Sequence, residues 1–167
     1  MLELRKYKNS DAKYIVSWLK NEYAFRQWSA DRYDSYPITA DDMNHYYAQY
    51  SDDELYKLTA VDGSEIIGHL TIRFTDEARK TARIGFVIVD DCQRGKGYGK
   101  QLVSSALEYA FDKLNAAKVT LGVFENNTPA IHCYLSCGFQ TVETEITESY
   151  KCMGEIWNCI EMEMDKQ

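Results

Sequence analysis

Three glycines at alternate positions separate an apolar, strand-like run from a long amphipathic, helix-like pattern. The run covers residues 82–89, and the octapeptide that follows reads Gln93-Arg94-Gly95-Lys96-Gly97-Tyr98-Gly99-Lys100. Glycine adopts backbone conformations that other residues avoid and lets the main chain approach a ligand, so several N–H groups can converge on one anion. The positive end of the following helix dipole adds to that attraction. The loop therefore predicts a phosphate-binding turn between a strand and a helix.

Two common phosphate-binding motifs do not match this spacing. A Walker loop ends in Gly-Lys-Ser/Thr, whereas Gln101 follows Gly99 and Lys100 and offers no hydroxyl to a magnesium ion. A Rossmann fingerprint needs a third glycine where this chain has Lys100. Arg94-x-x-Gly97-x-Gly99 instead resembles the loop of the GNAT superfamily of acyl-CoA-dependent N-acetyltransferases, which holds the coenzyme A pyrophosphate. Taken alone, the glycines also fit an ordinary turn between a strand and a helix.

A second segment carries the same resemblance. The GNAT signature strand–Asn-x-x-Ala-Ile-x-x-Tyr-x-x-x-Gly-Phe is matched in residues 123–139 at Asn127, Ala130, Ile131, Tyr134, Gly138 and Phe139. The residues themselves predict a short helix here, because Thr128 can cap it, Pro129 suits its first turn and Gly138 suits the position past its end. Both motifs occur in the family's order. Residues 146–157, with Leu4-Arg5 and Trp18-Leu19, resemble the branch of ribosomal-protein N-terminal and polyamine acetyltransferases.

Hydrophobic periodicity predicts the remaining elements. Strands are expected at 2–7, 55–61, 65–74, 82–89, 119–124, 139–147 and 157–164, and helices from Asp11, after a cap at 39–42, at 102–114 and after Thr128. Residues 21–38 lack periodicity and are predicted as a loop or broken helix, and Met43, Tyr46, Tyr47 and Tyr50 as a core stripe. The order β-α-α-β-β-β-α-β-α-β-β predicts an α/β fold, a mixed and mostly antiparallel sheet flanked by helices. This resembles the GNAT fold as a single domain over residues 1–167.

Composition limits the class of protein. The 167 residues are 45% hydrophobic and 27% charged, the balance of a globular domain, and no run of eighteen apolar residues or signal peptide occurs. Five cysteines, an odd number, indicate reduced thiols, so a cytoplasmic location without a membrane partner is expected. Cys133 and Cys137 lie one helical turn apart but lack a second ligand pair, so no metal is predicted.

The net charge of −7 disfavours a nucleic-acid partner and favours a cationic amine. Acidic residues lie in the segments that wall the acceptor side of this family: Asp31, Asp34, Asp41, Asp42, Glu143, Glu145, Glu148 and Glu155. Most are expected to be solvated surface charges. If two or three face the cleft, a polycationic amine or basic N-terminal peptide should be the better acceptor.

The resemblance implies acetyl-CoA as the donor and direct attack by an acceptor amine in a ternary complex. The loop Arg94, Gly95, Lys96, Gly97, Tyr98, Gly99 and Lys100 would hold the pyrophosphate, and the pantetheine arm would follow Val87, Ile88 and Val89. The strand before the loop would splay from the next strand. By register with the family, Asn127 contacts the cofactor arm and Tyr134 protonates the leaving thiolate, although Tyr134 taken alone fits packing as well.

Several questions stay open at this point. Relatives place a carboxylate where this chain has Arg83 and Gly122, so no general base is assigned; Glu125 and Asp90 fit solvated turns. The acceptor is a small molecule or peptide: a polyamine, an aminoglycoside-like amine or a protein N-terminus. The alternatives are a non-catalytic acyl-CoA-binding or sensing module on the same fold and an unrelated nucleotide-binding domain. Use of acyl groups other than acetyl and assembly as a homodimer are also open.

Overall fold

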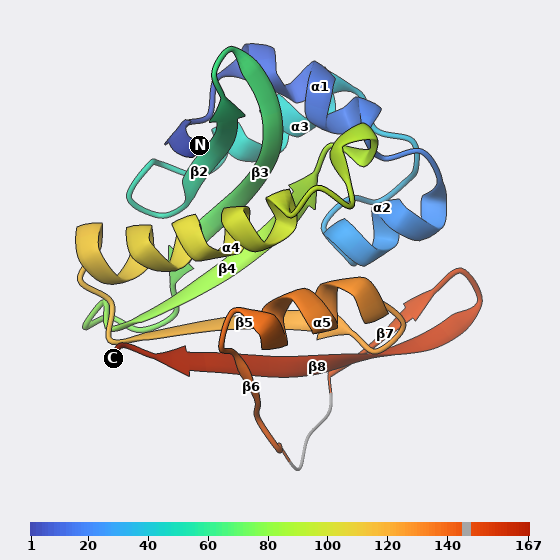
Figure 1. The fold of residues 1–167 in the computed structure, drawn as a ribbon. Helices are drawn as coiled ribbons and strands as arrows, with labels where there is room; N and C mark the ends of the chain where they lie inside the picture. Colours follow the sequence, from blue (N-terminus) through green and yellow to red (C-terminus); the bar gives the residue numbers. More distant parts are fainter. Residues whose placement is uncertain (145–147) are drawn as a thin grey trace.

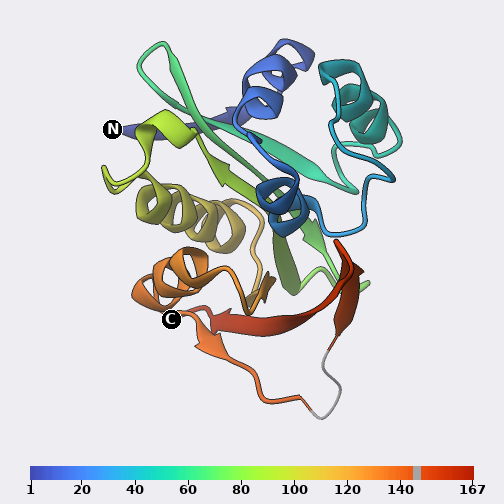
Figure 2. The same ribbon diagram turned by 90° about the vertical axis from the view of Figure 1, so that its right-hand side faces the viewer.

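In the computed structural model, which describes residues 1–144 and 148–167, eight strands form one sheet with helices on both of its faces (Figures 1 and 2). The strands are β1 (Leu2–Lys6), β2 (Tyr56–Asp62), β3 (Glu65–Phe74), β4 (Thr81–Val89), β5 (Lys118–Phe124), β6 (Gln140–Thr141), β7 (Ser149–Cys152) and β8 (Glu155–Asp165). The helices are α1 (Ala12–Ser17), α2 (Glu22–Ser29), α3 (Ala40–Ala48), α4 (Tyr98–Glu108) and α5 (Thr128–Ser136). A π-helical turn, Tyr109–Lys113, extends α4, and short 3-10 turns span Asn9–Asp11 and Asp91–Gln93.

The strand order is β1-β2-β3-β4-β5-β8-β6, with β7 paired to the first half of β8. Within the described residues β4 and β5 are the one parallel pair, and the other pairs are antiparallel. The prediction of a mixed, mostly antiparallel sheet flanked by helices is confirmed. The element order adds α2 to the predicted helices and divides the predicted terminal strand pair into β6, β7 and β8.

Two apolar cores lie on the two faces of the sheet. On one face α4 and α5 cover the strands through residues such as Leu102, Val103 and Tyr134, and Figure 2 shows these two helices side by side. On the other face α1, α2 and α3 enclose Ile15, Phe25 and Met43. The sheet therefore separates the glycine loop and α5 from the side on which α2 and α3 lie.

Helix ends follow the capping chemistry of the sequence, with one exception. Thr39 and Asp42 form a capping box at the start of α3, as predicted, and Gly138, with φ of +104°, follows α5. The cap of α5 was expected at Thr128 but lies at Asn127, so Thr128 is the first helical residue. Asn127 makes no side-chain capping bond, and Pro129 in the first turn has no N–H, so one fewer amide of α5 is left without a partner.

The stretch 21–38 contains a helix that periodicity did not reveal. Asn21 caps α2 by accepting a hydrogen bond from the Ala24 amide at 2.8 Å, and Phe25 of this helix is fully buried. Aromatic residues lie on several sides of α2, because the helix contacts both an apolar core and a pocket. The sequence therefore shows no single apolar face at helical spacing.

The predicted core stripe after Thr39 is half right. Met43 and Tyr47 are buried, whereas Tyr50 is 38% exposed and lines a pocket together with Tyr46. The hairpin around Gly154 is present, but its first strand is β7, and residues 145–147 of the predicted strand lie outside the described residues. In the described part of the chain no helix is both long and apolar enough to cross a membrane.

Candidate functional site

The glycine loop joins β4 to α4 and presents an open backbone. Gly95 and Gly97 have φ of +81° and +82°, a region that favours glycine, and Gly97 is the N-cap of α4. A Cβ atom added to either residue would meet no atom within 4 Å, so the space in front of the loop is free. The first amides of α4 have no carbonyl partners inside the helix. This arrangement fits the pyrophosphate expected there, because free amides and open space coincide at a positive helix end.

The side chains of the loop divide into two groups. Arg94, Lys96 and Lys100 are exposed cations, and the Lys96 ammonium donates to Gln93 Oε1 at 2.8 Å. Tyr98 instead donates from its hydroxyl to Asp62 Oδ2 at 2.8 Å and so connects the start of α4 to the end of β2. The hydroxyl of Tyr98 is therefore a structural anchor, whereas the three cations face solvent where a phosphate would lie.

Near its middle β4 separates from β5 and forms a bulge against β3. Its parallel pairing with β5 covers only Thr81 to Arg83, although both strands continue. On the other side, the register with β3 shifts between His69 and Thr71, and Phe86 within this bulge has φ of +50°. A positive φ in an aromatic residue is uncommon and marks a backbone held by its surroundings. The expected splay of β4 from β5 is confirmed: it begins after Arg83 and includes Val87, Ile88 and Val89.

Helix α5 places the second motif beside the first. A Cβ on Gly99 would lie 3.7 Å from Cys133 Sγ, and the Cys137 thiol lies 3.9 Å from the Lys100 carbonyl oxygen. Burial raises the pKa of the Cys133 thiol to about 11, so it is a protonated packing group. The glycine loop and the Asn127–Tyr134 helix thus adjoin, as the family resemblance requires.

Tyr134 is buried, and its ring packs edge-on against Phe139 with the centroids 5.9 Å apart. Burial raises the pKa of Tyr134, so the phenol keeps its proton at neutral pH. Its hydroxyl makes no hydrogen bond to the residues that the structure describes. The side chain of Asn127 likewise makes no capping bond, and its backbone amide donates to the Phe124 carbonyl at 2.9 Å. The Tyr134 hydroxyl and the Asn127 side-chain amide are therefore both available to a ligand.

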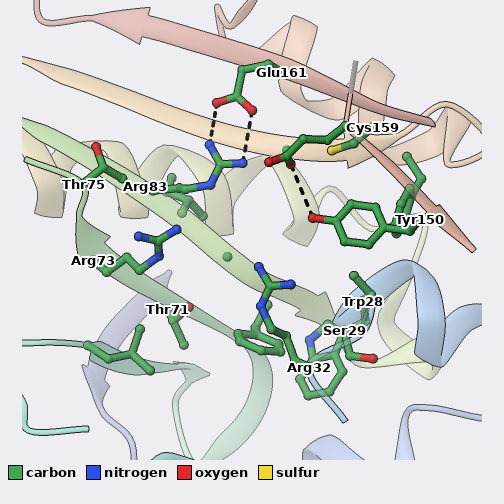
Figure 3. A pocket seen from close by; sticks show the side chains of 18 of the residues that line it. Trp28, Ser29, Arg32, Thr71, Arg73, Thr75, Arg83, Tyr150, Cys159 and Glu161 are labelled. Carbon is green, nitrogen blue, oxygen red and sulfur yellow. Dashed lines mark hydrogen bonds and ion pairs between the residues drawn. The ribbon is translucent and has the colours of Figure 1, made fainter. Parts of the chain in front are cut away.

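A cavity of about 870 Å³ opens on the other face of the sheet, where β4 and β5 separate (Figure 3). Its walls come from α2 and the segment after it, α3, β3, β4, β5 and the β7–β8 hairpin. Ile84, Gly85 and Phe86 of β4 and Gly122 and Phe124 of β5 line it, so the split between the strands reaches the cavity. We name this cavity the acceptor pocket. Residues 87–100 are absent from its described lining, so pocket and glycine loop lie on different sides of the split.

Charged groups dominate the polar lining of the acceptor pocket. The Arg83 guanidinium donates to both carboxylate oxygens of Glu161, at 2.5 and 3.1 Å, and burial of this pair is partial. Tyr150 donates to Glu148 Oε2 at 3.4 Å. Figure 3 shows the guanidinium groups of Arg32, Arg73 and Arg83 turned toward the same space. The pocket therefore contains both signs of charge, with arginine as its only type of cation among the described lining residues.

The acidic residues expected at the cleft are mostly elsewhere. Glu148 lines the acceptor pocket, but Asp31, Asp34, Asp41, Asp42, Glu143 and Glu155 are not among its described lining residues, and Glu145 lies outside the described chain. Asp42 is engaged in the capping box of α3. The carboxylates that do line the pocket beside Glu148 are Glu54 and Glu161, which the sequence analysis did not single out. Glu161 pairs with Gly122 across β5 and β8, so its carboxylate reaches Arg83 over a position without a side chain.

One group of metal-ligand types lies at the start of the loop. Ligand atoms of Asp90, Asp91 and Cys92 are within 4.8 Å of one another. Asp90 Oδ1 accepts a hydrogen bond from the Cys92 amide at 2.9 Å, within the turn. Asp91 lies 3.9 Å from the Lys20 ammonium, so both carboxylates already have a partner in the protein.

Comparison with known proteins agrees with this geometry. The sequence model of the acetyltransferase (GNAT) family matches residues 15–139. Spermidine N(1)-acetyltransferase of Vibrio cholerae is 27% identical over 140 residues, which are 83% of this chain and 78% of that protein. L-amino acid N-acetyltransferase AaaT of Escherichia coli is 30% identical over 84 residues, 50% of this chain and 51% of that protein.

A solved structure shares the fold over nearly the full length. The crystal structure of spermidine N-acetyltransferase from Vibrio cholerae in complex with CoA and spermine superimposes with a TM-score of 0.82 and 23% identity, covering 98% of this chain and 95% of that chain.

Proposed function

This chain belongs to the acetyltransferase (GNAT) family and is an acetyl-CoA-dependent N-acetyltransferase, and we propose that it acetylates a primary amine of a small molecule by direct attack in a ternary complex. The observation that carries the proposal is the split between β4 and β5. It adjoins the glycine loop and α5 at one end and opens into the acceptor pocket on the other face. Donor and acceptor would therefore approach one point from two sides, without a covalent enzyme intermediate.

The donor side would use backbone groups. The amides from Arg94 to Lys100, with the exposed cations Arg94, Lys96 and Lys100, would bind the pyrophosphate. Val87, Ile88 and Val89 of β4 would bind the pantetheine arm through main-chain groups that no longer pair with β5. The side-chain amide of Asn127 would contact the same arm. Acetyl-CoA supplies a thioester carbonyl, and a free amide of the bulged β4 would polarise it as an oxyanion hole does.

Proton transfer needs one donor and one acceptor. As the new N–C bond forms, the amine loses a proton and the departing sulfur gains one. Tyr134 would supply the proton to sulfur, since its phenol is protonated and free of hydrogen bonds to described residues. Each described carboxylate of the acceptor pocket already has a partner, so the amine proton would pass to water rather than to a residue.

The relatives narrow the acceptor class without deciding it. The Vibrio cholerae relative is named for spermidine, which makes a polyamine the first acceptor to test, and the Escherichia coli relative is named for L-amino acids. A non-catalytic acyl-CoA-binding module is not favoured, because these relatives are named as enzymes.

The test is acetyl-CoA-dependent thiol release with a panel of polyamines, amino acids, aminoglycosides and N-terminal peptides. Direct attack predicts intersecting initial-velocity patterns and no mass increase when the protein is incubated with acetyl-CoA alone. Parallel patterns with a stable acetylated protein would contradict the ternary complex, and the absence of thiol release with every acceptor would contradict the proposed function.

A further inference from the structure

Arginine is concentrated in the acceptor pocket. Three of the chain's seven arginines, Arg32, Arg73 and Arg83, line it, and none of the twelve lysines is among its described lining residues. The net charge of the chain is −7, so this gathering of guanidinium groups is a local exception. Arginine differs from lysine in its planar set of donors, which matches both oxygens of a carboxylate.

Arg73 is the arginine of this group that has no partner among the described residues. Arg73 on β3 and Arg83 on β4 are directly opposite in the antiparallel register. Glu161 binds Arg83 through two hydrogen bonds, and Asp31 lies 2.9 Å from Arg32. Arg73 makes no hydrogen bond or ion pair with the described residues. Two like charges on opposed strand positions repel each other, and a bound anion would relieve that repulsion.

The charges of the three arginines affect one another, as expected if their guanidinium groups lie in the same pocket. Burial lowers the pKa of Arg73, and Arg83 and Arg32 lower it further through repulsion. For Arg32, burial lowers the pKa, but the neighbouring Tyr150 and Asp31 raise it by more, so its pKa lies above the usual value. Both side chains keep contact with solvent through the pocket, so an entering ligand can reach them.

The carboxylates of the pocket are engaged with its walls. Glu161 binds Arg83, Glu54 accepts from the Ser51 amide at 2.8 Å, and Glu148 accepts from the Tyr150 hydroxyl. Each described carboxylate therefore has a partner of its own, and Arg73 is the charged group left for a ligand.

The position of Arg73 suits a second group on the acceptor. Thr71, two residues before Arg73 on β3, is opposite Gly85, where β4 has already left β5. Two residues along a strand span about 7 Å, a distance that a small acceptor and an extended arginine bridge together. We infer that the acceptor carries a carboxylate a few bonds from the amine that it presents to the split between β4 and β5, and that Arg73 binds this carboxylate. The inference rests on the proposed function and narrows its acceptor to amino-acid-like zwitterions.

Matched acceptors that differ only by the carboxylate provide the test. L-lysine and cadaverine, L-ornithine and putrescine, and L-phenylalanine and phenylethylamine are assayed by acetyl-CoA-dependent thiol release, with spermidine alongside. The carboxylated member of a pair should have a kcat/KM roughly tenfold to hundredfold higher, the range expected for a hydrogen bond between charged groups. Equal use of both members, or better use of spermidine than of every carboxylated acceptor, would overturn the inference.

The variant Arg73→Gln assigns the effect to one residue. It should remove the preference within each pair by lowering kcat/KM for the carboxylated member, and Arg73→Lys should restore part of the preference. Arg79→Gln is the matched control, because this substitution removes the same charge outside the pocket. Arg79 is an exposed arginine of the β3–β4 connection and is not among the described lining residues. An Arg73→Gln protein that keeps the preference would overturn the role of Arg73.

Calorimetry of the CoA-loaded protein with the same pairs separates the two proposals. Tighter binding of the carboxylated member without thiol release would support the inference and contradict the proposed acetyl transfer. Thiol release from both members at equal rates, with equal binding, would support acetyl transfer and overturn the inference.

Discussion

The hydroxyl of Tyr47 lies 2.6 Å from Nε2 of His69, and both side chains are buried where α3 meets β3. His69 is also opposite Ile88, next to the bulge of β4. The same helix contributes Tyr46 to the acceptor pocket, and Tyr50, just after its end, lines the pocket as well. This contact therefore holds α3, which forms part of the pocket wall, against β3, the neighbour of the strand that separates from β5.

Burial lowers the pKa of His69 to about 3, from an ordinary value of 6.5, so the folded protein keeps this ring neutral. The unfolded chain takes up a proton below pH 6.5, and the folded one does so only near pH 3. The stability that the neutral ring contributes is therefore complete above pH 6.5 and is lost as the pH falls toward 3, by at most about 1.4 kcal/mol per pH unit.

His69→Gln should flatten this pH dependence, because glutamine keeps a partner for the Tyr47 hydroxyl and does not titrate. Chemical denaturation between about pH 6 and about pH 4.5 measures the free energy of unfolding in a window above the titration of the carboxylates. Parallel pH profiles for the two proteins would mean that His69 is protonated in the folded state.

The glycine loop should fail to bind acetyl-CoA when Gly97 gains a side chain. Gly97→Val would occupy the open space before the α4 amides and would strain a backbone with φ of +82°. We expect calorimetry to show acetyl-CoA affinity at least roughly tenfold lower, the size of one lost charge-assisted hydrogen bond. Gly154→Val is the matched control, because Gly154 has φ of +78° with equally open space but lies in the β7–β8 turn. Equal affinities in the two variants would exclude the loop as the pyrophosphate site.

Tyr134→Phe should lower kcat by roughly 10²–10⁴, the usual effect of removing a general acid. Acetyl-CoA affinity and the unfolding free energy should change little, since the ring contact with Phe139 is kept and the hydroxyl has no described protein partner. Tyr14→Phe, on an exposed tyrosine of α1, is the control for loss of a phenol. Unchanged turnover in Tyr134→Phe, with acetyl transfer rate-limiting, would leave Tyr134 as a packing residue.

The glycine loop and α5, which we propose bind the donor, could be predicted as local elements because short-range chemistry determines them. Glycine spacing, the strand before Val89 and the end of α5 at Gly138 are all properties of short segments, and the structure places them as expected. The cap expected at Thr128 shifted by one residue, which is the usual error at helix ends.

The acceptor pocket could not be predicted in this way because it depends on long-range register. The register of the β3–β4 hairpin places Arg73 opposite Arg83, and β8 brings Glu161 to Arg83 from 78 positions further along the chain. Helical periodicity also predicted that Tyr46 and Tyr50 belong to the core, since a stripe facing a pocket has the same spacing as one facing a core. The one sequence signal for the pocket was the presence of two arginines at pocket-facing positions of neighbouring strands.

Gly122 should tolerate no side chain, because its missing side chain leaves room for the guanidinium of Arg83, which binds Glu161. A Cβ at this position would lie 2.8 Å from Arg83 Nη2 and 2.9 Å from Cys159 Sγ. Gly122→Ala should therefore displace the guanidinium from Glu161, lower the free energy of unfolding by about 1–3 kcal/mol as overpacking does, and raise the acceptor KM without changing acetyl-CoA affinity. Adding Cys159→Ala should recover part of the lost stability, because it removes the less flexible of the two neighbours. A Gly122→Ala protein with unchanged stability and acceptor KM would show that the Arg83 guanidinium shifts without consequence and does not shape the pocket.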